Sequence, residues 1–150
     1  MLLEIIFAAG CFWGVEKNFE RFDGVVDVVS GYSGGNYEDP TYELVLEHSK
    51  LQGESFLSAL KNIGKSDVEI ATEAKLVNHT EAVKVIYDPS IVSTEALIKS
   101  FWQIHNPTQV DGQGFDIGNN YRSALYWTTE AQKDIAFRTR DEFQILLNNN

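Results

Sequence analysis

GCFWG, at residues 10–14, marks the turn on which the rest of the predicted fold depends. The apolar run that precedes it, 2–9, is typical of a short buried strand. After it, Val15 and Phe19 recur at the spacing of one helical face. The sequence therefore predicts a strand that turns directly into a helix, with Cys11 at or near the N-terminus of that helix.

Cys11 is the only cysteine among the 150 residues, and two interpretations of it are open. At a helix N-terminus, unpaired backbone N–H groups and the positive end of the helix dipole favour an anion, so a thiol there ionises more readily than a free one. The thiolate is the reactive form of cysteine. A lone cysteine beside Phe12 and Trp13 is, on the other interpretation, a small buried hydrophobic residue.

The composition indicates a single domain, 1–150, because 43% hydrophobic and 12% aromatic residues are enough for a sizeable core. The formal net charge of -10 repels phosphate backbones and anionic lipids, which argues against nucleic acid and membranes as partners. One cysteine allows neither an internal disulfide nor a paired-thiol zinc site. The run at 2–9 is too short to span a membrane and lacks a basic leader. We therefore expect a cytoplasmic protein without a bound metal.

The remaining elements are predicted from strand-forming residues and helix-capping signals. Runs rich in β-branched and aromatic residues indicate strands at 25–32, 81–87 and 123–127. Helices are predicted to begin at three capping signals, which are Asp39-Pro40, Ser93, and the capping box of Thr129 with Gln132. Strands and helices are mixed without a regular βα repeat, so the predicted fold class is α+β.

Two stretches between these elements have a composition of their own. Residues 47–76 combine a helical stripe ended by Gly64 with a strand-like alternation at 68–74, and they carry no obvious chemistry. Residues 108–120 contain three glycines with polar residues between them. That composition is typical of a loop that shapes a binding site and not of one that fills a core.

Seven short motifs follow one another along most of the chain. They are GCFWG at 10–14, GYSGG at 31–35, DPTYE at 39–43, HTEAV at 79–83, YDP at 87–89, HNPTQ at 105–109 and DIGNNYRS at 116–123. In that order they resemble the peptide methionine sulfoxide reductase A family. The resemblance implies an α+β fold in which a mixed β-sheet packs with helices as a ferredoxin-like two-layer sandwich.

The resemblance also implies an enzyme that reduces the S epimer of methionine sulfoxide, free or in proteins, to methionine. A sulfoxide oxygen is a poor leaving group unless it is protonated, so such a site needs a thiolate to attack sulfur and an acid to protonate oxygen. By the family pattern, Cys11 is the nucleophile and Glu81 is the acid. The products would be methionine and a Cys11 sulfenic acid, and the enzyme would use no cofactor beyond an external thiol reductant.

The same pattern implies a set of substrate-binding residues. Tyr42 and Tyr121 would donate hydrogen bonds to the sulfoxide oxygen, and Asp116 would support this polar side through further hydrogen bonds. Phe12 and Trp13 would form an apolar pocket for the S-methyl group. Without the resemblance, the tyrosines would be half-buried packing residues and the other two aromatic residues ordinary core.

The chain departs from the family pattern in three ways. It has no second cysteine, so an external thiol, either thioredoxin or glutathione with glutaredoxin, is expected to resolve the sulfenic acid. The helix-and-strand unit at about 47–76 is an insertion between Tyr42 and Glu81. The chain stops at Asn150 without the family's C-terminal Ala-Glu-x-Tyr-His-Gln motif. We hypothesise that the strand at 68–74 takes the vacated place in the sheet.

Two other functions remain open at this point. The chain could be a binding or regulatory module that keeps the fold without turnover. A polar set such as Cys11, Glu81 and the two tyrosines is costly to keep half-buried without use, which argues against this reading. A peroxide-sensing thiol protein would need only an activated Cys11, and it would leave Glu81 and the tyrosines unexplained.

Overall fold

The computed structural model describes residues 1–50 and 78–149 of the chain. Most of the unit predicted to be inserted at about 47–76, including the strand expected at 68–74, lies outside the described residues. The hypothesis that this strand completes the sheet therefore stays a prediction.

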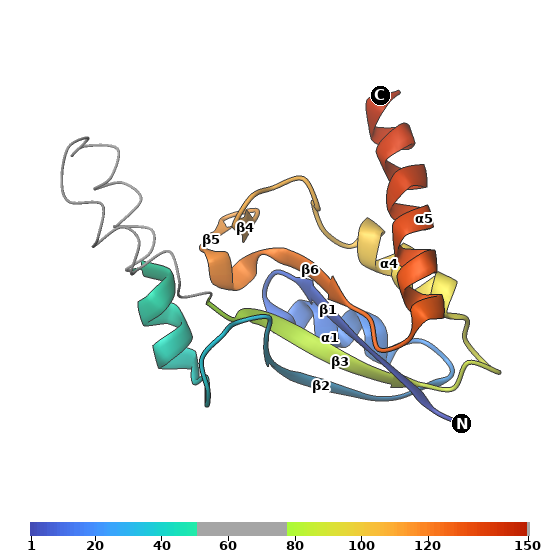
Figure 1. Ribbon diagram of the computed structural model, residues 1–150, viewed down its shortest axis with the longest axis horizontal. Helices are drawn as coiled ribbons and strands as arrows, with labels where there is room; N and C mark the ends of the chain where they lie inside the picture. The colour runs from blue at the N-terminus through green and yellow to red at the C-terminus, as the bar shows by residue number, and fades with distance from the viewer. Residues whose placement is uncertain (51–77, 150) are drawn as a thin grey trace.

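Four strands form one sheet at the centre of the molecule (Figure 1). They are β1 (Leu3–Ala9), β2 (Val25–Ser33), β3 (Thr80–Tyr87) and β6 (Ser123–Tyr126), in the spatial order β2-β3-β1-β6. The helix α1 (Phe12–Glu20) connects β1 to β2, and α4 (Thr94–Gln103) follows β3. This is the β-α-β-β-α-β order of a ferredoxin-like sandwich, which confirms the predicted α+β class. All three strand pairs that the described residues form in this sheet are antiparallel.

The core lies on one face of the sheet, because alternate residues of a strand point to the same side. Phe7 of β1 is fully buried opposite Val83 of β3. Its ring stacks on Phe19 of α1 with centroids 4.6 Å apart, and on Phe101 of α4 with centroids 5.1 Å apart. The two helices therefore pack on the same face and fix where the N-terminus of α1 lies relative to β3.

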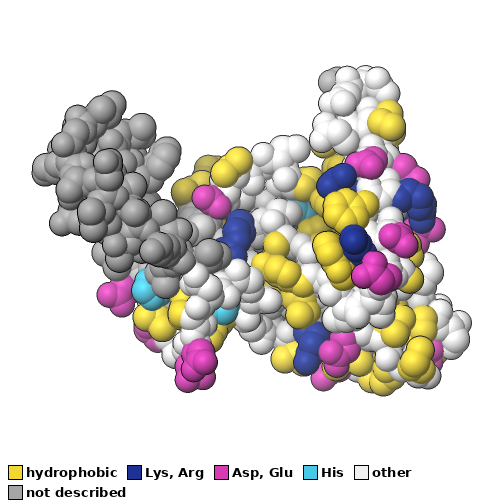
Figure 2. Space-filling view, in the orientation of Figure 1, with side chains coloured by type: hydrophobic (Ala, Val, Ile, Leu, Met, Phe, Trp, Pro, Cys, Tyr) yellow, Lys and Arg dark blue, Asp and Glu magenta, His cyan; other side chains and the backbone are white. Residues whose placement is uncertain are grey.

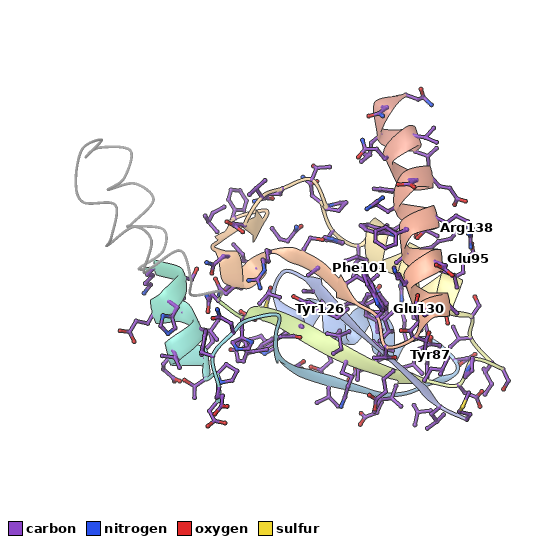
Figure 3. All side chains as sticks on the ribbon, viewed as in Figure 1. Tyr87, Glu95, Phe101, Tyr126, Glu130 and Arg138 are labelled. Carbon is purple, nitrogen blue, oxygen red and sulfur yellow. The ribbon has the colours of Figure 1, made fainter. Side chains whose placement is uncertain are left out.

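The last helix, α5 (Glu130–Asn148), begins at the capping box that the sequence predicts. Gln132 is buried, and its Nε2 donates to the carbonyl oxygen of Glu4 at 2.9 Å. Further along, the Arg138 guanidinium lies 2.7 Å from the Glu95 carboxylate of α4 (Figure 3). These contacts join α5 to the sheet and to α4. Among the described helices, α5 included, none is long and apolar enough to cross a membrane.

The helix that carries Tyr42 begins later than predicted. Residues 42–50 are helical, and Thr41 Oγ1 accepts a hydrogen bond from the Leu44 N–H at 3.2 Å. Thr41 is therefore the N-cap. The prediction of a cap at Asp39 is wrong, because its φ of 50° places that residue in a left-handed turn before the helix.

The loop predicted at 108–120 contains a short hairpin and one helical turn. The strand β4 (Gly112–Gln113) pairs with β5 (Asp116–Ile117), and the 3₁₀ turn η1 (Asn119–Tyr121) follows. The loop thereby returns the chain to the edge strand β6, and it places a carboxylate and a tyrosine near the start of β3.

Candidate active site

The turn from β1 into α1 exposes the cysteine. Gly10 has a φ of +97°, which favours glycine, and a Cβ at this position would lie 2.9 Å from the side chain of Gln113 in β4. Cys11 is the N-cap residue of α1, as predicted, and it makes no side-chain capping bond. Its side chain is exposed to solvent. The structure therefore argues against the interpretation of Cys11 as a buried packing residue.

Glu81 is buried next to this turn. It lies on β3 in the same row as Val83, so it points to the face that α1 covers, and it is 3% exposed. The backbone N–H of Phe12, the first residue of α1, donates to Glu81 Oε1 at 3.5 Å. The N-terminus of α1 thus has Cys11 as its N-cap residue and donates a backbone N–H to the Glu81 carboxyl group of the sheet.

The surroundings of Glu81 favour its protonated form. Burial is the largest effect and raises the pKa of Glu81, while the hydrogen bond from the Phe12 N–H lowers it. The negative charge of Asp116 raises the pKa again, and the nearby Tyr121 hydroxyl lowers it. The net result is a pKa above the ordinary glutamate value, so Glu81 keeps its proton to a higher pH than an exposed carboxyl group does. That is the property a proton donor needs.

The Tyr121 hydroxyl lies within electrostatic reach of the Glu81 carboxyl group, and Tyr42 lies within reach of Tyr121. Burial raises the pKa of Tyr121, and Glu81, Tyr42 and Asp116 raise it further. Tyr42 is the first residue of the helix 42–50 and is half-exposed. The structure therefore brings Glu81, Tyr42 and Tyr121 into one neighbourhood beside the turn that carries Cys11, although these residues come from four separate segments. Their roles in catalysis and binding stay predictions.

A buried hydrogen-bond network holds these segments together, and no motif or spacing in the sequence indicates it. Asn78 is 2% exposed and donates to the carbonyl oxygen of Val45 at 3.0 Å and to Asn119 Oδ1 at 2.7 Å. It accepts a hydrogen bond from the Tyr37 hydroxyl at 2.6 Å. Arg122 donates to the carbonyl oxygens of Asn78 and Asn119, both at 2.8 Å. The network ties the helix 42–50 and η1 to the start of β3.

The remaining predicted residues lie around this centre in different ways. Phe12 is half-buried beside the acid, whereas Trp13 is 74% exposed and makes no ring contact with the described residues. Asp116 is exposed on β5, and its side chain forms no hydrogen bond within the described ranges. Its charge raises the pKa of Glu81. The hydrogen-bonding role that we expected of Asp116 stays a prediction.

Tyr32 also belongs to this arrangement, although the sequence analysis did not single it out. In the β2-β3 register it stands directly opposite Glu81, and its ring centroid lies 5.8 Å from that of Phe12. The signal available in the sequence was its place at the end of a predicted strand, within the GYSGG motif at 31–35.

The histidines near the site are engaged in packing. His79 and His48 both contact the ring of Tyr37, with centroids 4.6 and 4.8 Å away. His79 Nδ1 accepts from the Gly35 N–H at 3.1 Å, and its Nε2 lies 2.8 Å from the Tyr37 carbonyl oxygen. In 1–50 and 78–149, no three His, Cys, Asp or Glu side chains come together in a group that could hold a metal ion.

The chain matches the family model described as peptide methionine sulfoxide reductase over residues 3–56 and 69–147. The peptide methionine sulfoxide reductase MsrA of Methanosarcina mazei is 38% identical over 138 residues, which cover 92% of this chain and 53% of the relative. The chain thus spans about half the length of the curated relatives it matches.

Solved structures agree with this match. Methionine sulfoxide reductase A of Corynebacterium diphtheriae superposes with a TM-score of 0.70 at 28% identity, over 97% of this chain and 59% of that one. Mxr1 from Saccharomyces cerevisiae in reduced form superposes with a TM-score of 0.73 at 26% identity, over 99% and 71%. With its family match over most of the sequence and its fold shared with these structures, the chain belongs to the peptide methionine sulfoxide reductase family.

Proposed function

We propose that this protein reduces the S epimer of methionine sulfoxide, free or within proteins, to methionine. The observation that carries the proposal is the pairing of an exposed thiol with a buried acid at one helix N-terminus. Cys11 is the N-cap of α1, and the next residue, Phe12, donates its backbone N–H to Glu81. A thiol and a proton donor at the same helix N-terminus suit an attack on sulfur coupled to protonation of oxygen.

In the proposed reaction, the Cys11 thiolate attacks the sulfoxide sulfur and Glu81 gives its proton to the sulfoxide oxygen. The hydroxyl group then passes from the substrate sulfur to the Cys11 sulfur, as the bond between oxygen and the substrate sulfur and the transient bond between the two sulfur atoms both break. The substrate sulfur gains two electrons and becomes the thioether, while Cys11 loses two and becomes a sulfenic acid. Glu81 ends as a carboxylate, so the atoms and the charge balance.

The other residues would bind the substrate. The Tyr42 and Tyr121 hydroxyls would donate to the sulfoxide oxygen as it gains negative charge. The raised pKa of Tyr121 keeps that hydroxyl group a donor. Phe12 and Trp13 would contact the S-methyl group, and the exposure of Trp13 leaves its ring free to pack against a bound substrate. Asp116 would keep the proton on Glu81 through its charge.

A second thiol must recycle Cys11, because the chain has one cysteine. The sulfenic acid would react with an external thiol to give a mixed disulfide and water, and a further thiol would release Cys11. Thioredoxin or glutathione with glutaredoxin can supply these thiols, and Mxr1 from Saccharomyces cerevisiae has been solved in complex with Trx2. We place the protein in the cytoplasm, where such reductants are kept reduced.

We also propose that residues 1–150 act as one catalytic domain with an inserted unit at about 47–76. Support comes from the family match, which leaves residues 57–68 of that unit unmatched between its two parts.

The experiment is an anaerobic single turnover. Reduced protein is mixed with peptides that carry either the S or the R epimer of methionine sulfoxide, and methionine and free thiol are quantified. We expect one methionine for each Cys11 thiol lost, from the S epimer alone, and none from Cys11→Ser.

The same experiment separates the other two functions. No methionine from either epimer, with the protein folded by circular dichroism, would favour a binding or regulatory module. Loss of the thiol to hydrogen peroxide at a rate far above that with the sulfoxide would favour a peroxide sensor.

A further inference from the structure

Tyr32 lies on the same face of the sheet as the proposed acid. It is near the end of β2, and the register pairs it with Glu81 of β3. Residues directly opposite each other in an antiparallel pair have Cβ atoms about 4.5–5.5 Å apart, so these two side chains leave the sheet together. The next pair in the same row, Ser30 with Val83, belongs to the helix-covered face.

The ring of Tyr32 also contacts Phe12, whose backbone N–H binds the Glu81 carboxyl group. Its centroid lies 5.8 Å from that of Phe12, with the ring planes inclined by 53°. Phe12 is the residue whose backbone N–H donates to Glu81. Tyr32 therefore touches both the acid's own strand and the first residue of α1, which are the two elements that fix the acid in place.

The hydroxyl group of Tyr32 is not used elsewhere in the described part of the chain. No hydrogen bond joins it to another described residue, whereas the hydroxyls of Tyr37 and Tyr87 both have side-chain partners. Burial raises the pKa of Tyr32 to about 12, and the charges of Glu81, Tyr42 and Tyr121 contribute in the same direction. The group is therefore a neutral hydrogen-bond donor near neutral pH, and the charge of Glu81 acts on it.

We propose that Tyr32 is a positioning residue that acts through Glu81: its ring supports Phe12, and its hydroxyl group stabilises the carboxylate that remains after proton transfer. This inference rests on the proposed function and adds a residue to it. A tyrosine that only filled space would serve equally well as phenylalanine, which gives the proposal a direct test.

The test compares Tyr32→Phe, which removes the hydroxyl group alone, with Tyr32→Leu, which removes the ring as well. Tyr87→Phe is the matched control, because it removes a hydroxyl group from the same face at the far end of β3. For each protein, the single-turnover rate constant and the apparent dissociation constant of an S-sulfoxide peptide are measured from pH 5 to 9. The titration of Glu81 is followed separately by NMR with ¹³C-labelled glutamate, assigned with Glu81→Gln.

We expect Tyr32→Phe to slow the single-turnover step about tenfold with little change in the dissociation constant. Glu81 should titrate at a higher pH in this variant, since its carboxylate loses a polar neighbour, and the alkaline fall of the rate should move with it. Tyr32→Leu should in addition weaken peptide binding, because Phe12 loses its support. Tyr87→Phe should keep the rate and lose stability.

Two results would overturn the proposal. One is a Tyr32→Phe variant with the wild-type rate and an unchanged Glu81 titration. The other is a rate loss in Tyr87→Phe equal to that in Tyr32→Phe, which would mean that the effect is general destabilisation. If the wild-type protein makes no methionine, the proposed function fails, and the Glu81 titration alone still decides whether Tyr32 acts on the acid.

Discussion

The burial of Glu81 makes the stability of the folded protein depend on pH in a direction that follows from its raised pKa. The pKa of Glu81 is raised above the ordinary 4.5 in the folded protein, chiefly by burial. The contribution of this group to stability is therefore fully present below the unfolded-state pKa and is lost as the pH rises through the folded-state pKa. Glu81→Gln should match the wild type in urea unfolding near pH 4 and be more stable at pH 8. Equal stability at both pH values would contradict the raised pKa.

The same substitution should have the opposite effect on activity. Glutamine occupies the place of Glu81 and cannot deliver a proton, so the single-turnover rate should fall by about 10²–10⁴-fold. Glu130→Gln is the control, because Glu130 is an exposed glutamate at the start of α5. The wild-type rate should decline as the pH rises through the pKa of Glu81, and that decline should be absent in Glu81→Gln. A variant with more than a tenth of the wild-type rate would remove Glu81 from the acid role.

A motif predicts that a stretch belongs to the site, but it does not show which of its residues face the acid, as with Tyr32 of GYSGG at 31–35. Cys11 and Glu81 stand in GCFWG and HTEAV, and the structure places them at one helix N-terminus. Tyr32 joins them because β2 pairs with β3 in one register, which a sequence does not specify. The exposure of Trp13 could not be predicted either, because helical periodicity shows which residues share a face of a helix and not how deeply each is buried.

The hydrogen-bond network around Asn78 joins separate elements into one site, and a substitution of Asn78 tests its effect on stability and activity. Asn78→Ala removes the buried hydrogen bonds that Asn78 makes with the Tyr37 hydroxyl and with Asn119 Oδ1, which should cost about 1–3 kcal/mol of unfolding free energy. The single-turnover rate should also fall, because the helix with Tyr42 and the turn with Tyr121 lose their common anchor. Denaturant unfolding and rapid-quench assays measure the two effects.

Thr129→Ala is the matched control for this prediction. It removes the side-chain cap of α5, which should cost about 1 kcal/mol, at a place remote from Cys11. Its single-turnover rate should equal that of the wild type under conditions where both proteins are folded. If the rate falls as far in Thr129→Ala as in Asn78→Ala, the network has no specific effect on the site.

Elements were predictable where the signal is local. The capping box of α5 and the cap of α4 at Ser93 occur as the sequence indicates, because each needs only residues within one turn. The cap of the helix 42–50 was misplaced at Asp39, since Asp and Thr are both good caps and the left-handed backbone at Asp39 excludes it. Sequence alone does not reveal which of two neighbouring capping residues has the extended backbone.

The negative net charge of the whole chain bears on how fast it associates with charged substrates. The net charge is -10, and several of the basic side chains are paired on α5, where Arg138 and Lys133 contact acidic neighbours (Figure 2). Around the site, the charges of Asp116 and Glu43 act on Glu81 and Tyr32. We therefore expect a negative field at the proposed substrate site.

Such a field should favour cationic peptides. We expect the second-order single-turnover rate constant for methionine sulfoxide between two lysines to exceed that for the same peptide with two aspartates about tenfold in ~10 mM salt. The ratio should approach one in ~1 M salt, because the Debye length then falls to about 3 Å. A serine-flanked peptide serves as the neutral control and should change little with salt. A lysine preference that persists in high salt would instead mean that the flanking side chains make short-range contacts, and then the overall charge of the molecule would not be the cause.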